Sequence, residues 1–246
     1  MYKENPKTKG SGIICCIPQT GICPNGCEDC FFQSERSYLE PLADNLPNMP
    51  TLEEAKNKVV RVNDGNDSCV KIDLVMEAVK DFPMKFYNTS ICSYPKIEKF
   101  DAPFVLTVNP GNMTDSDWHK LFVGYHECGK KLMFVRFRTN MWNLSALDEA
   151  INYYTHFEIP VVLTFMAYYS EDSIPEQYRK YYVYRKRTLN SYWAITTAGW
   201  DMVMSKYKYN SFVYSCGRVE GELGTTGCKR CGNCLREYFN AIEKMK

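Results

Sequence analysis

Three cysteines near the N-terminus constrain this chain more than any other feature. Cys23, Cys27 and Cys30 have the spacing Cys-x3-Cys-x2-Cys, and Pro24 and Gly26 favour a tight loop between them. With 12 cysteines in 246 residues, random placement would give this spacing only about 0.03 times per chain. Three thiolates without a Cys or His directly after them leave a bound metal centre with an open coordination position. We therefore expect a [4Fe-4S] cluster with one iron free to bind a ligand.

A second set of cysteines lies near the C-terminus. Cys216 is followed by Cys228, Cys231 and Cys234 in a segment rich in glycine. Four thiolates can close the coordination of a metal centre completely. Three consecutive cysteines with two-residue gaps are typical of ferredoxin-like [4Fe-4S] loops, whereas zinc ribbons more often have two separated Cys-x2-Cys pairs. We expect an auxiliary iron-sulfur cluster here, with zinc as the alternative.

The cysteine content and the composition indicate a metal-binding protein of the cytoplasm. Structural disulfides are uncommon in a reducing compartment, so metal binding explains the cysteines best. Residues 1–10 are polar and no apolar run is long enough to span a bilayer, so we expect a cytoplasmic address without membrane contact. The net charge of +1 gives no chain-wide argument for nucleic acid as a partner. The dispersed cysteines are expected to be small buried hydrophobes, although Cys15 or Cys16 could fold back as a further ligand.

Alternating strand and helix patterns predict an α/β fold. Short apolar runs bounded by breakers indicate strands at 12–17, 58–62, 84–87, 104–108, 131–138 and 160–166. Apolar residues at helical spacing indicate helices at 52–58, 70–82, 115–128 and 144–157. This alternation implies a parallel sheet with right-handed crossovers. The length suits one domain with a small appendage, so we assign residues 1–210 to the α/β domain and 211–246 to a cysteine-rich extension.

The three-cysteine motif, placed after a first strand, resembles the hallmark of the radical S-adenosylmethionine (radical SAM) superfamily. By order of elements the resemblance covers roughly residues 10–215, but only the cysteine motif is specific. It implies a partial (β/α)6 barrel whose cluster binds the methionine moiety of S-adenosylmethionine (SAM) at the open iron. It also implies an oxygen-sensitive enzyme, in which an electron from a donor such as flavodoxin or ferredoxin cleaves SAM to a 5'-deoxyadenosyl radical. C-terminal auxiliary clusters are common in this superfamily.

The resemblance also suggests SAM contacts beside the cysteines. The family usually has an aromatic residue just before the third cysteine, near the adenine, whereas this chain has Asp29 there and Phe31 just after the motif. The family's motif for the methionine amino group follows the second strand, where this chain has a polar turn at 63–68. Its candidate contacts are Asn63, Asp64, Gly65 and Asp67. Asp64 or Asp67 would accept a hydrogen bond from the ammonium group, and an ordinary β-turn is the alternative interpretation.

Three further residues are candidate SAM contacts by family analogy. Asn109 follows the fourth strand and would contact the ribose, unless it serves only as a turn residue before Pro110. Arg136 and Arg138 lie on the fifth strand and share one face, because alternate side chains point the same way. A planar guanidinium suits the methionine carboxylate if this face is the barrel interior. The alternative is that both arginines lie outside among the helices.

The sequence leaves the substrate open. A peptide, a nucleotide or nucleic acid, and a small metabolite are all compatible with the resemblance. Residues 168–193 combine tyrosines with basic residues, which would suit stacked bases, although a helix with Tyr178, Tyr181 and Tyr182 against the barrel explains them better. The alternative function is a non-catalytic, zinc-stapled module that binds nucleic acid. His119 and His126 lie without ligand spacing and are expected to be surface or packing residues.

Overall fold

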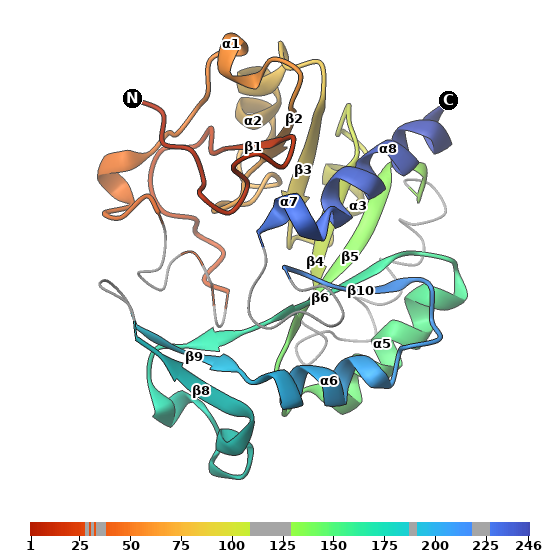
Figure 1. Ribbon diagram of the computed structural model, residues 1–246. Coiled ribbons are helices and arrows are strands. Elements are labelled where there is room, and N and C mark those ends of the chain that lie inside the picture. Colours follow the sequence, from red (N-terminus) through yellow and green to blue (C-terminus); the bar gives the residue numbers. More distant parts are fainter. Residues whose placement is uncertain (28–29, 31, 33–37, 109–128, 187–190, 218–226) are drawn as a thin grey trace.

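Seven short parallel strands form one sheet that curls into a half-barrel (Figure 1). The computed structural model describes residues 1–246 except 28–29, 31, 33–37, 109–128, 187–190 and 218–226. In sheet order the strands are β1 (Ile13–Cys16), β2 (Val59–Val62), β3 (Lys85–Thr89), β4 (Phe104–Val108), β5 (Leu132–Thr139), β6 (Val161–Phe165) and β10 (Val213–Ser215). All neighbours pair in parallel, so their carboxyl ends meet at one edge of the half-barrel. The predicted α/β class and the partial barrel are confirmed.

Helices cover the convex face of the sheet. The helices are α1 (Leu52–Ala55), α2 (Ile72–Val79), α3 (Tyr94–Ile97), α5 (Leu144–His156) and α6 (Thr197–Ser205). The 3-10 helices are η1 (Ala43–Asn45), η3 (Gly129–Lys131), η4 (Glu171–Ser173) and η5 (Glu176–Tyr181). Buried residues of α2, α5 and α6 form one apolar cluster with alternate residues of the strands, such as Val60, Leu106 and Leu163. The predicted helix at 115–128 lies outside the described residues.

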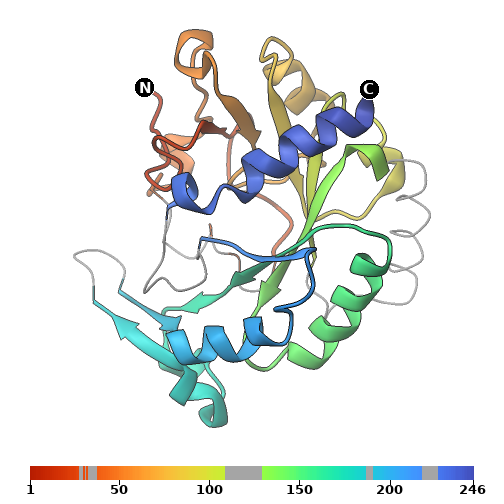
Figure 2. The same cartoon turned by 45° about the vertical axis from the view of Figure 1, so that its right-hand side comes forward.

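The C-terminal helix closes the opposite, concave face. α7 (Cys228–Cys231) and α8 (Asn233–Met245) are joined at Gly232, whose φ of 68° suits a residue without Cβ. α8 crosses the inner side of the sheet (Figure 2). Its Tyr238 and Ala241 pack against Val59, Phe86, Val105, Phe134 and Val162, one residue from each of five strands. Residues 211–246, predicted as an extension, therefore supply both a strand and the inner helix of the half-barrel.

The two ends of the chain meet beside α7. The Cys228 amide donates a hydrogen bond to the Lys7 carbonyl at 3.0 Å. A Cβ on Gly12 would lie 3.4 Å from Leu235 Cδ2, so the segment before β1 runs close along the first turn of α8. The Tyr2 hydroxyl donates to the carbonyl of Cys15 at 2.8 Å, which anchors the N-terminus to β1.

A small antiparallel sheet follows β6 at the carboxyl edge. It contains β7 (Ala167–Tyr168), β9 (Tyr192–Ile195) and β8 (Tyr182–Arg185), in this order. Tyr182 is buried, and Tyr178 and Tyr181 pack against the main core, so their predicted packing role is confirmed. The predicted helix is wrong for β8, because η5 ends at Tyr181 and an extended segment pairs with β9. Within the described part of the chain, no helix has the length and hydropathy to cross a bilayer.

Truncation of Tyr238 is expected to destabilise the packing of α8 on the concave face. Its side chain is 4% exposed and packs against Phe86 with ring centroids 6.4 Å apart, whereas the next residue, Phe239, is 49% exposed. Tyr238→Ala should lower the free energy of unfolding by about 3 kcal/mol, because the cavity is left between the helix and the sheet. Phe239→Ala is the matched control and should cost less than about 1 kcal/mol. Denaturant unfolding measures both, and equal losses would contradict this description of α8.

Candidate functional site

The three-cysteine loop follows β1 at the carboxyl edge of the half-barrel. After β1, Ile17 and Asn48 exchange two backbone hydrogen bonds of 2.9 Å, which fix where the loop begins. Cys23, Cys27 and Cys30 are all partly exposed, and the Cys30 amide donates to the Cys27 carbonyl at 3.2 Å. Burial raises the pKa of the Cys23 thiol, the Asn25 amide partly offsets this, and Asp67, Cys27 and Cys30 raise the pKa further. The three thiols are thus close electrostatic neighbours.

Ser90, directly after β3, connects this loop to the polar turn after β2. Its hydroxyl oxygen lies 3.7 Å from Cys27 Sγ and accepts a hydrogen bond from Asn25 Nδ2 at 3.4 Å. The same hydroxyl donates to Asp67 Oδ2 at 2.9 Å, and the Ser90 amide donates to that oxygen at 2.6 Å. Sequence reasoning missed Ser90 because a serine after a strand carries no distinctive pattern.

Asp67 is a buried hydrogen-bond hub. Besides the two bonds from Ser90, its Oδ1 accepts from the Cys69 amide and from the Thr89 hydroxyl, both at 2.8 Å. These four bonds match the roughly four lone-pair positions of a carboxylate. The Asp67 carboxylate therefore joins the ends of β2 and β3, and a ligand ammonium group would have to displace one of these donors.

Asp64, in the same turn, has a less complete set of donors. Asn5 Nδ2 donates to its Oδ2 at 2.8 Å and the Tyr38 hydroxyl donates at 3.2 Å, while Oδ1 lies 3.5 Å from the Tyr38 hydroxyl. Beside it, Asn63 has a φ of 61° and its Nδ2 donates to Ser68 Oγ at 3.1 Å.

Two buried oxygens of this region lack hydrogen-bond partners in the described structure. They are Asn63 Oδ1 and Gln19 Oε1. Gln19 Nε2 donates to the carbonyls of Asp67 and Val70, so the Gln19 side chain contacts the polar turn that contains Asn63. Buried polar atoms are nearly always satisfied in native proteins. Two orphaned acceptors next to a carboxylate with capacity to spare suit a ligand that brings N–H donors.

The ring of Phe32 lies directly on Gly65. A Cβ at Gly65 would fall 2.1 to 2.3 Å from three atoms of this ring, so only glycine permits the contact. Phe32 thus supplies an aromatic surface beside the three-cysteine loop. The predicted contacts Phe31 and Asn109, as well as Asp29, lie outside the described residues.

Arginines from two strands face the concave side of the sheet. Arg61 follows Val59 by two residues and Arg136 follows Phe134 by two, so both guanidiniums share the face on which α8 packs. Arg136 Nη1 donates to Asn88 Oδ1 at 3.3 Å, and by the same alternation Arg138 belongs to this face. Of the two orientations left open for Arg136, the structure has the one on the concave face. Sequence reasoning missed Arg61, whose signal was a charged residue alternating with valines in the run 58–62.

The four C-terminal cysteines gather around the end of β10. Cys216 directly follows β10 and its amide donates to the Leu163 carbonyl at 2.8 Å. Cys231 Sγ lies 3.9 Å from the Ser215 carbonyl. Cys228 begins α7, and Cys234 lies in the first turn of α8.

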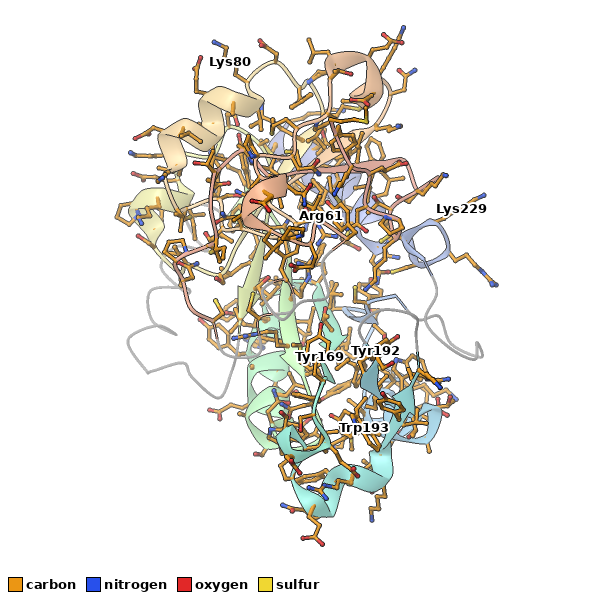
Figure 3. The ribbon with its side chains drawn as sticks, turned by 90° about the vertical axis from the view of Figure 1, so that its left-hand side faces the viewer. Arg61, Lys80, Tyr169, Tyr192, Trp193 and Lys229 are labelled. Carbon is orange, nitrogen blue, oxygen red and sulfur yellow. The ribbon has the colours of Figure 1, made fainter. Side chains whose placement is uncertain are left out.

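The C-terminal cysteines and the concave arginines shift one another's pKa values. Burial raises the pKa of the Cys234 thiol to about 11; Arg136 and Arg61 act to lower this pKa, and Cys216 and Cys228 to raise it. Burial acts to lower the pKa of the Arg61 guanidinium, but Cys15 and Asp64, followed by Cys234 and Cys228, give a net upward shift. The second cysteine set and the concave arginines therefore influence one another electrostatically. Figure 3 shows Arg61 in the interior of the molecule and Lys229 projecting from its edge.

Both cysteine sets offer thiols, the donors that zinc and iron-sulfur clusters bind. No three Cys, His, Asp or Glu side chains among the described residues are placed to hold one metal ion.

Comparisons with known proteins add no identification. No family model, curated protein or solved structure matches this chain.

Removal of the Asp67 carboxylate is expected to loosen the carboxyl edge. Asp67→Ala leaves four donors without this acceptor, two of them on the buried residues Cys69 and Thr89, so it should lower the free energy of unfolding by about 3 kcal/mol. The control is Asp73→Ala, since the Asp73 side chain is 88% exposed and its contact with Lys99 is 3.8 Å long; it should cost less than about 0.5 kcal/mol. If denaturant unfolding gives Asp67→Ala a cost as small as that of the control, Asp67 does not hold the turn.

Proposed function

We propose that this protein is a radical SAM enzyme that cleaves S-adenosylmethionine reductively at a [4Fe-4S] cluster held by Cys23, Cys27 and Cys30. The main support for the proposal is the position of the three-cysteine loop. A loop with three thiols, and no fourth Cys or His directly after it, follows the first strand of a parallel half-barrel, at the edge where the strands' carboxyl ends meet. In α/β sheets and barrels this edge is where ligands bind.

The polar turn after β2 would receive the methionine end of SAM. The ammonium group has three donors, and Asn63 Oδ1, Gln19 Oε1 and Asp64 Oδ1 are acceptors with unused capacity in this region. Arg138 would pair with the methionine carboxylate from the concave wall. When bound, the cluster supplies the electron that breaks a C–S bond of SAM.

The aromatic residues beside the loop would hold the adenine. Phe32 offers a ring that packs on Gly65, next to the turn that receives the methionine end. Phe31, the neighbouring residue in the chain, stays a candidate for the same contact, as Asn109 does for the ribose.

The second cysteine set would hold an auxiliary [4Fe-4S] cluster, with zinc as the alternative. Cys216, Cys228, Cys231 and Cys234 can supply four thiolates, so such a centre would carry electrons or fix the C-terminus and would not bind SAM. The enzyme also requires an external one-electron donor such as flavodoxin or ferredoxin. The substrate class, whether peptide, nucleotide or nucleic acid, or small metabolite, stays open.

Anaerobic reduction in the presence of SAM tests the proposal. Purified protein should be brown, should carry about eight irons per chain if both centres are cubanes, and should form 5'-deoxyadenosine when dithionite and SAM are added. Cys27→Ala should abolish 5'-deoxyadenosine formation, because it removes one of three cluster ligands. Cys92→Ala, a change outside both cysteine sets, should retain it.

Two results would contradict the proposal. One is full SAM cleavage by Cys27→Ala, which would remove the cluster from the three-cysteine loop. The other is colourless protein with two zinc ions, which would favour the zinc-stapled nucleic-acid-binding module.

A further inference from the structure

Two half-buried guanidiniums lie on the concave wall, and none of the described carboxylates forms a salt bridge with Arg61 or Arg136. The Nε of Arg61 is buried and has no hydrogen-bond partner among the described residues. Arg136 has the neutral Asn88 amide at 3.3 Å and the Phe134 ring at 5.6 Å. A charge withdrawn from water is costly unless an opposite charge compensates it, so a nearby anion would stabilise this wall.

The C-terminal cysteines are placed to supply that anion. Cys216 and Cys234 pack on the same apolar cluster as Val59 and Phe134, the residues two positions before the two arginines. Cys228 and Cys234 are electrostatic neighbours of both guanidiniums. Asp64 also acts on Arg61 but lies beyond salt-bridge distance and is engaged by Asn5 and Tyr38.

We propose that Arg61 and Arg136 form a cationic wall that stabilises the metal centre held by Cys216, Cys228, Cys231 and Cys234. This inference rests on the second centre of the proposed function. Four thiolates outweigh the positive charge of a zinc ion or of an oxidised cubane core, so the centre is anionic with either metal. The four cysteines are partly buried, and positive charge from β2 and β5 would stabilise an anionic centre there.

Lys229, a cation within the C-terminal cysteine segment, does not take this role. Lys229, between Cys228 and Cys231, is exposed and projects from the surface (Figure 3). Water screens an exposed charge strongly, so its influence on the centre is small. Lys229 is therefore a matched control, since it is close in sequence to the ligands but faces solvent.

Metal retention tests the wall independently of catalysis. In the full chain with Cys23, Cys27 and Cys30 changed to Ala, only the C-terminal centre can load. After anaerobic reconstitution, iron and zinc per chain are measured over time with EDTA present. Arg61→Gln and Arg136→Gln should each lose metal about tenfold faster than the parent, the size of effect that residues supporting metal ligands commonly have. Lys229→Gln should stay within about twofold of the parent.

A conservative variant separates charge from packing. Arg61→Lys keeps the positive charge and should retain metal within about threefold of the parent, while Arg61→Gln does not. If the centre is an iron-sulfur cluster, both Gln variants should also shift its reduction potential to more negative values, because a lost positive charge disfavours the added electron. Circular dichroism of the metal-free proteins checks that each variant folds.

Several outcomes would contradict the proposed role of Arg61 and Arg136. Metal loss in the Gln variants at the parent rate would do so, as would equal losses in Lys229→Gln or in Arg61→Lys. A parent that binds no metal at the C-terminal cysteines would overturn both the wall and the auxiliary centre. Failure of SAM cleavage with arginine-dependent metal retention would instead reject the radical reaction and leave the wall standing.

Discussion

The concave face of the half-barrel has to be filled, and the way it is filled determines where chemistry can occur. α8 covers the inner face with Tyr238 and Ala241, which contact apolar residues from five strands. Towards the carboxyl ends of the strands, the same face carries Arg61, Asn88 and Arg136. The helix thus covers one part of the interior and leaves a polar part towards the carboxyl ends of the strands. Apolar burial stabilises the fold, and the polar remainder is available to a charged ligand.

The topology explains how cysteines from opposite ends of the chain come to one edge. β1 and β10 are the outermost strands of a parallel sheet, and each cysteine set begins just after one of them. Parallel pairing aligns the carboxyl ends, and the hydrogen bond from Cys228 to Lys7 ties the C-terminal set to the segment before β1. The central strands supply the connecting polar groups, among them Asp67 and Ser90.

Much of the framework could be predicted from the sequence, because long-range order follows from local patterns there. The six apolar runs at 12–17 through 160–166 all overlap strands of the main sheet, which has the predicted parallel arrangement. β10 was not predicted because three residues are too short to show a period. Asp67 was predicted as a contact of the SAM ammonium group or as a turn residue. Its role in joining β2 and β3 could not be predicted, because its four donors come from residues that only folding brings together. Arg61 was not recognised either, because it lies within a predicted strand. Its position on an enclosed face arises only when α8 packs against the sheet.

Binding of SAM to a cluster held by the three-cysteine loop is tested most directly by the electron paramagnetic resonance spectrum of the reduced protein, recorded with and without SAM. A variant with Cys216, Cys228, Cys231 and Cys234 changed to Ala leaves only the cluster of Cys23, Cys27 and Cys30 to be observed. We expect a reduced [4Fe-4S] signal whose shape changes when SAM is added, because SAM would bind the iron without a cysteine ligand. A signal that SAM leaves unchanged, or the absence of any iron-sulfur signal, would contradict it.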